Sequence, residues 1–186
     1  MHDARVREID RDFAQAAGFQ TVGLSGYSLS ATMLGKPDVG LTTMTEVVQM
    51  TGYVCDAVDI PVLADADTGY GNVPSVIRTV QLFEQAGASA LQLEDQAFPK
   101  RCGHFDGHTL IEANDMQAKI AAAAAARQDP NLVLVARTDA RGVLGLDEAV
   151  RRGHGYLEAG ADAYLCKPAS RKMLRAKLGV ILRLRA

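Results

Sequence analysis

The sequence lacks the features that mark several common classes of protein. Its three cysteines lie far apart, form no CxxC pair and are odd in number, which argues against a disulfide framework or structural zinc and favours a reducing cytosol. It has neither a signal peptide nor an apolar run of about 18 residues, so we expect a soluble, cytoplasmic protein without a membrane partner. A net charge of −2 gives no indication of a nucleic-acid partner.

Predicted strands and helices alternate along the 186 residues, a length that fits one domain. Three stretches resemble one another, each with a helix end, a glycine C-cap and an apolar strand, at 15–25, 84–95 and 158–167. Further strands are predicted at 60–65 and 131–139, and helices at 43–57, 73–86, 112–128 and 146–159.

Continuous apolar strands separated by helices indicate an α/β fold with a parallel sheet. Two architectures fit this pattern, a doubly wound open sheet and a (β/α)8 barrel. No GxGxxG follows the first strand, which weakens the dinucleotide-binding form of the open sheet. A barrel predicts polar chemistry just after the carboxyl end of each strand.

Polar residues do gather at four successive strand ends: SGYSLS after 20–24, DADTGYGN after 60–64, EDQAFPKRCGH after 89–93 and RTDARG after 132–136. A parallel sheet places all four on one face, so an active-site rim is the favoured interpretation. Asp65, Asp67 and Glu94 would converge there as hard oxygen ligands, which suits Mg²⁺ or Mn²⁺ better than zinc. The alternative is an aspartate-rich turn that caps the helix beginning at 73.

Two further rim segments suit the binding of an anion. SGYS at 25–28 offers backbone N–H groups and hydroxyls to a carboxylate or phosphate, although an ordinary turn explains it equally well. Arg137 would clamp a carboxylate with two hydrogen bonds, or else form a structural salt bridge with a rim aspartate.

Cys102 lies among cations rather than among aliphatic residues. Lys100, Arg101 and His104 would favour its thiolate form if they lie near it, while the alternative is an exposed loop cysteine with unrelated basic neighbours. His104 would assist the chemistry or hold the loop by hydrogen bonding. Pro99, Gly103 and Gly107 predict a mobile loop suited to cover the site.

The motifs SGYS, GKPDVG (35–40), DADTGYGN, LEDQ, PKRCGH and ARTDA, in this order, resemble the isocitrate lyase/phosphoenolpyruvate mutase superfamily from about residue 15 to 166. The branch most similar contains 2-methylisocitrate lyase, dimethylmalate lyase and oxaloacetate-acting enzymes. The resemblance implies a (β/α)8 barrel with Mg²⁺ at the strand ends, a small carboxylate substrate, and the homotetramer typical of the family.

The resemblance also implies roles for individual residues. Asp65 would be the direct metal ligand, with Asp38, Asp67 and Glu94 acting directly or through water. The substrate would be held by Ser25, Gly26, Tyr27, Gly103 and Arg137. Lys100, Cys102 and His104 would lie on the gating loop, where lyases of this family use the cysteine as general acid.

The implied reaction is cleavage of a 2-hydroxy di- or tricarboxylate to pyruvate or another 2-oxo acid plus a carboxylate. Cys102 favours carbon–carbon cleavage, because the phosphonomutase branch generally lacks this cysteine. Oxaloacetate decarboxylation or hydrolysis, phosphonomutase-type chemistry and a non-catalytic remnant are the alternatives. Gln92 stands where typical methylisocitrate lyases have histidine, so the substrate is left open.

The chain departs from the family pattern at both ends. Residues 1–13 contain no strand ending in Pro-Gly-x-x-Asp, and Lys167 stands where an acidic residue is expected after the sixth strand. Residues 171–186 form an atypical basic tail, for which a helix with a solvated basic face is the ordinary interpretation. We therefore expect residues 1–186 to form a single partial barrel, with the first strand altered and the last strands missing.

Overall fold

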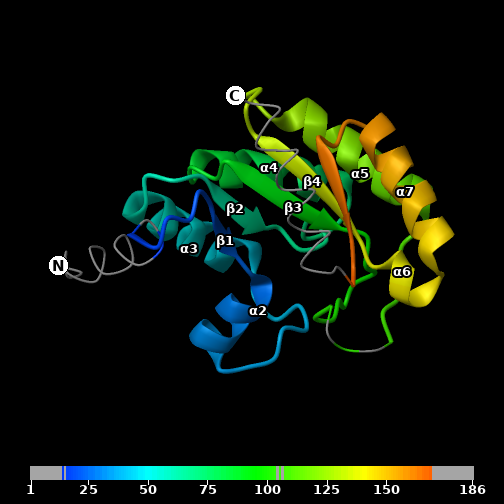
Figure 1. The fold of residues 1–186 in the computed structure, drawn as a ribbon, viewed down its shortest axis with the longest axis horizontal. Helices are drawn as coiled ribbons and strands as arrows, with labels where there is room; N and C mark the ends of the chain where they lie inside the picture. The colour runs from blue at the N-terminus through cyan, green and yellow to red at the C-terminus, as the bar shows by residue number, and fades with distance from the viewer. Residues whose placement is uncertain (1–13, 15, 104, 106, 169–186) are drawn as a thin grey trace.

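The computed structural model describes residues 14, 16–103, 105 and 107–168, and its strands and helices alternate as predicted (Figure 1). The strands are β1 (Val22–Leu24), β2 (Val62–Asp65), β3 (Ala90–Glu94), β4 (Val133–Thr138) and β5 (Ala163–Cys166). The longer helices are α3 (Met44–Ala57), α4 (Val73–Gln85), α5 (Ala113–Ala126) and α7 (Leu146–Glu158). Three short helical segments follow strand ends: α2 (Gly26–Leu29), η1 (Ser30–Leu34) and α6 (Ala140–Val143).

All five strands are parallel and lie in the order β1-β2-β3-β4-β5. A doubly wound sheet reverses its strand order at a switch point, where its ligand binds. Within the described residues each strand instead pairs with the next one along the chain. That order is the one found in a (β/α) barrel, because every crossover advances in the same direction.

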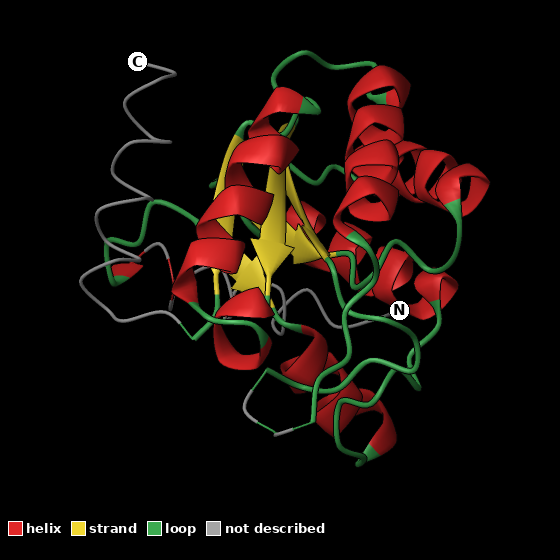
Figure 2. Ribbon diagram, turned by 90° about the vertical axis from the view of Figure 1, so that its right-hand side faces the viewer, coloured by secondary structure: helices red, strands yellow, loops and turns green. Residues whose placement is uncertain are grey.

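The helices pack outside the strands and against one another in chain order. Helix α3 contacts α4, α4 contacts α5, and α5 contacts α7; Figure 2 shows the strands at the centre with helices around them. On α4, Val76, Val80 and Phe83 are fully buried at helical spacing and contact the apolar side chains of the strands. Each such side chain contributes about 1.5–3 kcal/mol by its burial.

Local sequence signals explain where the elements begin and end. Helix α3 starts with a capping box, in which the Thr43 hydroxyl accepts from the Glu46 N–H and the Glu46 carboxylate accepts from the Thr43 N–H. Gly18, Gly87 and Gly160, one in each of the three similar stretches, all adopt positive φ. The predicted glycine C-caps are thereby confirmed.

The predicted strands and long helices are confirmed, with bounds that differ by at most two residues. The short helices α2, η1 and α6 were not predicted, because four or five residues carry too little periodicity to be recognised. Residues 1–13 and the basic tail 171–186 lie outside the described residues. In the described part of the chain, no helix has the length and apolar character needed to cross a membrane.

Candidate active site

The carboxyl ends of the strands meet at one edge of the sheet and carry the polar residues of the site. Asp65 ends β2 and Glu94 ends β3, while Arg137 on β4 is the register partner of Glu94. Gly26 opens α2 directly after β1, and its N–H donates to Asp65 Oδ2 at 3.3 Å. The parallel strand order therefore brings together residues that are more than 100 positions apart in the sequence.

Three aspartates and a lysine form the first half of the site. The N–H of Asp67 donates to Asp65 Oδ1 at 3.1 Å, and the backbone of Asp67 adopts the left-handed conformation, with φ of 50°. The Lys100 ammonium lies 2.5 Å from Asp38 Oδ1 and 2.5 Å from Asp67 Oδ1, and all three residues are buried. A Cβ at Gly26 would stand 3.3 Å from both Lys100 Nζ and Asp38 Oδ2, so a side chain here would crowd the cluster by a few tenths of an ångström.

The second half of the site is a buried ion-pair cluster around Arg137. Its Nη1 lies 2.7 Å from Glu94 Oε2, and its Nη2 donates to Asp139 Oδ1 at 3.0 Å. Glu94, Arg137 and Asp139 are each less than 5% exposed. Among the described residues, neither Glu94 Oε1 nor Arg137 Nε has a hydrogen-bonding partner, so both atoms are available to a ligand.

Burial of several carboxylates together raises their affinity for protons. Burial is the main cause that raises the pKa of Glu94 to about 8, with Asp65 and Asp67 adding to it and Arg137 opposing it. Burial and the neighbouring Asp65 likewise raise the pKa of Asp67 to about 6. Burial alone would lower the pKa of Lys100, but the surrounding carboxylates outweigh it and the pKa lies above its usual value.

The donor set fits a hard divalent cation. Asp38, Asp65, Asp67 and Glu94 supply only carboxylate oxygens, the ligands that Mg²⁺ and Mn²⁺ prefer. Within the described residues, no three metal-binding side chains are arranged around one point. The Lys100 ammonium instead stands between two of the carboxylates. The raised pKa values of Asp67 and Glu94 reflect carboxylates gathered in a buried place, and a bound cation would favour their charged forms.

The segment of residues 99–103, here called the cysteine segment, contacts this cluster. The Cys102 N–H donates to the Asp38 carbonyl at 3.0 Å, and the side chain of Cys102 is only 6% exposed. The exposed-cysteine alternative is therefore wrong. The Lys100 charge is directed at Asp38 and Asp67, and His104 lies outside the described residues.

A comparison with known proteins places these features in a family. A family model described as phosphoenolpyruvate phosphomutase matches residues 9–176. The chain belongs to the phosphoenolpyruvate mutase/isocitrate lyase superfamily. Membership confirms the barrel-type fold that the motif order implied, and the described residues contain five of its parallel strands.

Individual members of the superfamily are similar to the chain over part of their length. It is 50% identical to 2,3-dimethylmalate lyase of Eubacterium barkeri over 145 residues, 78% of this chain and 50% of that protein. It is 49% identical to 2-methylisocitrate lyase of Aeropyrum pernix over 149 residues, 80% of this chain and 47% of that protein. A crystal structure of phosphonopyruvate hydrolase with oxalate and Mg²⁺ matches with a TM-score of 0.78 and 39% identity, covering 98% of this chain and 61% of that one. The chain thus spans about half the length of the curated relatives it matches.

The predicted anion-binding residues lie near the carboxylate cluster in different environments. Gly26 is buried beside the carboxylates, whereas Ser25 and Tyr27 are exposed at the start of α2. Gly103 approaches Arg137 so closely that a Cβ there would stand 2.6 Å from Nη2. Arg137 forms buried salt bridges with Glu94 and Asp139, as in the alternative that gave it a structural role. Its Nε has no hydrogen-bonding partner among the described residues.

Three site residues were missed by reasoning from the sequence. Asp139 holds Arg137, and Lys167 lines a cavity of about 350 Å³ together with Gly103, His108 and Asp139. The Tyr70 hydroxyl is buried without a hydrogen-bonding partner among the described residues, and burial together with the nearby carboxylates raises its pKa. Asp139 and Tyr70 both belong to motifs quoted above, ARTDA and DADTGYGN, so their position after a strand was the available signal.

Proposed function

We propose that the chain forms the catalytic part of a Mg²⁺-dependent carbon–carbon lyase that cleaves a 2-methylisocitrate-like 2-hydroxy acid to pyruvate or another 2-oxo acid plus a carboxylate. The observation that carries the proposal is one buried cluster containing metal-type carboxylates, Arg137 and the cysteine segment. The similarity to two lyases at about half identity supports the same reaction class.

Different residues of the cluster would bind the metal ion and the substrate. Asp65 would hold Mg²⁺ directly, and Asp38, Asp67 and Glu94 would hold it directly or through water. Bound Mg²⁺ would stabilise negative charge on the oxygens of the 2-oxo acid half. Arg137, already fixed by two acidic partners, would donate to a substrate carboxylate through its remaining N–H groups.

The reaction requires one proton to leave the substrate and another to arrive. Loss of the hydroxyl proton allows the C2–C3 bonding electrons to move to C3 as C2 becomes a carbonyl. The resulting carbanion is delocalised into its own carboxylate and takes a proton at carbon. The Cys102 thiol would supply it, because the cysteine segment lies over the carboxylate cluster and its thiol is shielded from water.

The test is release of pyruvate from 2-methylisocitrate, dimethylmalate and oxaloacetate, and of oxalate from oxaloacetate, each with and without Mg²⁺. We expect Mg²⁺-dependent turnover of at least one hydroxy acid, and its loss by about two orders of magnitude or more in Cys102→Ser. Cys55→Ser is the matched control, since Cys55 is half-buried on α3.

The other possible outcomes either favour an alternative function or refute the proposal. Turnover of oxaloacetate that is unaffected by Cys102→Ser would favour the oxaloacetate-acting chemistry of the same superfamily. Binding of oxalate with Mg²⁺ by calorimetry, without turnover of any substrate, would make the chain a dicarboxylate-binding protein. The absence of both turnover and oxalate binding in a folded sample would refute the proposal.

A further inference from the structure

Gln96 is a buried polar residue, 1% exposed, to which the function proposed above assigns no role. Its Nε2 donates to the Arg101 carbonyl at 3.0 Å and to Asp139 Oδ2 at 3.2 Å. Its Oε1 accepts from the Arg101 N–H at 2.9 Å. One side chain therefore contacts both the cysteine segment and the acidic partner of Arg137.

The backbone on which Gln96 stands is fixed at the base of the loop. Gln96 pairs with Leu110 in an antiparallel bridge, and the Ala97 N–H donates to the Thr109 carbonyl at 2.8 Å. This bridge closes the two ends of the loop that contains the cysteine segment. The position of Gln96 is thus set by the strand end, and the segment extends beyond it.

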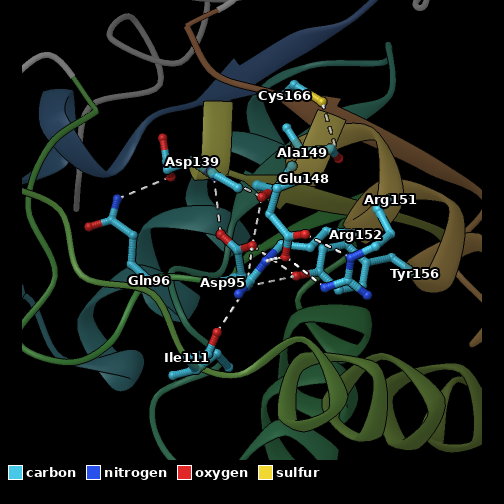
Figure 3. Close-up of polar contacts among 12 residues, drawn as sticks. Asp95, Gln96, Ile111, Asp139, Glu148, Ala149, Arg151, Arg152, Tyr156 and Cys166 are labelled. Atoms are coloured by element: carbon cyan, nitrogen blue, oxygen red, sulfur yellow. Dashed lines mark hydrogen bonds and ion pairs between the residues drawn. The ribbon is translucent and has the colours of Figure 1, made fainter. Parts of the chain in front are cut away.

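Asp139, the other partner of Gln96, is also held in place (Figure 3). Its N–H donates to Asp95 Oδ1 at 3.1 Å, while Asp95 Oδ2 accepts from Thr138, Tyr156 and Arg152. Asp95 is fully buried, so these contacts are shielded from water. The network gives Asp139 a fixed position from which it contacts Arg137 on one side and Gln96 on the other.

The chemistry of this position calls for a primary amide. The residue must donate to a carbonyl and to a carboxylate while accepting from a backbone N–H, and an amide offers two donors and one acceptor oxygen. A glutamate of the same shape would lose both donors and oppose the Asp139 carboxylate. A methionine would fill the space and make none of the three hydrogen bonds.

We propose that Gln96 is a positioning residue that holds the backbone of Arg101, and with it Cys102, over the site in a fixed relation to Asp139 and Arg137. Its effect on the segment is a property of the fold. Its effect on turnover rests on the proposed function, because it acts through the cysteine assigned there as proton donor.

The experiment measures the rate at which iodoacetamide alkylates each of the three cysteines, read separately by peptide mass spectrometry. In Gln96→Met the cysteine segment loses its side-chain anchor, so we expect Cys102 to react about tenfold faster. The rates at Cys55 and Cys166 should stay within about twofold of those in the unchanged protein. Thr51→Val is the control, since it removes a buried hydrogen bond that lies within α3, to the Val47 carbonyl, and it should leave the Cys102 rate unchanged.

An unchanged Cys102 rate, or an equal rise at all three cysteines, would overturn the proposal. Gln96→Glu, with the same shape, provides the same test if Gln96→Met does not fold. With an active sample, kcat should fall about tenfold while the KM stays within about twofold, because Arg137 keeps its ion pairs with Glu94 and Asp139. Alkylation decides the role of Gln96 even if no substrate is turned over, so failure of the proposed function and failure of this inference are separate results.

Discussion

Substitution of Gly103 by alanine tests how closely the cysteine segment approaches Arg137. A Cβ at this position would stand 2.6 Å from Arg137 Nη2 and 3.4 Å from Lys167 Cδ. Real Cβ atoms do not lie closer than 3.0 Å to atoms of other residues, so either the cysteine segment or the guanidinium of Arg137 must move. Since Gly103 is not in the left-handed conformation, the alanine backbone itself is unstrained and the contact is the whole effect.

The cost of that contact follows from what holds Arg137. Its Nη2 is 3.0 Å from Asp139 and its Nη1 is 2.7 Å from Glu94, so displacing the guanidinium weakens a buried, charge-assisted hydrogen bond. A loss of this kind costs about 1–3 kcal/mol, which corresponds to a fall in kcat/KM of roughly 5- to 160-fold. The assay is pyruvate release from the substrate that the unchanged chain turns over.

Gly142→Ala is the matched control. Gly142 lines the same cavity, yet no atom lies within 4 Å of a Cβ built there, so its kcat/KM should stay within about twofold of the unchanged value. Thermal melting of both variants checks that they fold. A Gly103→Ala protein with unchanged kcat/KM would show that the segment does not lie against Arg137 during turnover, and the reasoning above would be refuted.

Three further predictions concern stability, each measured by urea unfolding. Without metal, folded Glu94 holds a proton that the unfolded chain releases between pH 4.5 and about 8, so stability should fall as pH rises through this window, and Glu94→Gln should reduce the slope. Arg152→Met leaves the buried Asp95 without its cation and should lower the free energy of unfolding by about 3–5 kcal/mol. Arg151→Met removes only the exposed ion pair with Glu148 and should lower it by less than about 1 kcal/mol. Gly153→Ala places a methyl group against the ring of Tyr164 and should destabilise the protein by about 1–3 kcal/mol. The Cβ of Gly52→Ala would meet no atom within 4 Å, so this change should stabilise α3 by about 0.5–1 kcal/mol. Equal effects within either of these two pairs, or a flat pH dependence, would contradict the structural argument concerned.

The sequence predicted most of the fold because its local signals agree with the tertiary structure. Glycine C-caps, a capping box and apolar strands placed the long helices and the strands within a few residues of where they lie. The short helices after β1 and β4 were not predicted, since four or five residues are too few to show a helical period. The choice between a barrel and an open sheet also required the strand order, which is a property of pairing rather than of any one segment.

For the site, the sequence by itself determined which residue types gather at the strand ends, because a parallel sheet places every carboxyl end on one edge. It thereby indicated the carboxylates, Arg137 and Cys102 as a group. Only the tertiary structure decided how they pair: Lys100 with Asp38 and Asp67, Arg137 with Glu94 and Asp139, and Gln96 between Asp139 and the cysteine segment. Such pairings depend on distances of a few ångströms between distant parts of the chain, and residue type and spacing do not encode those distances.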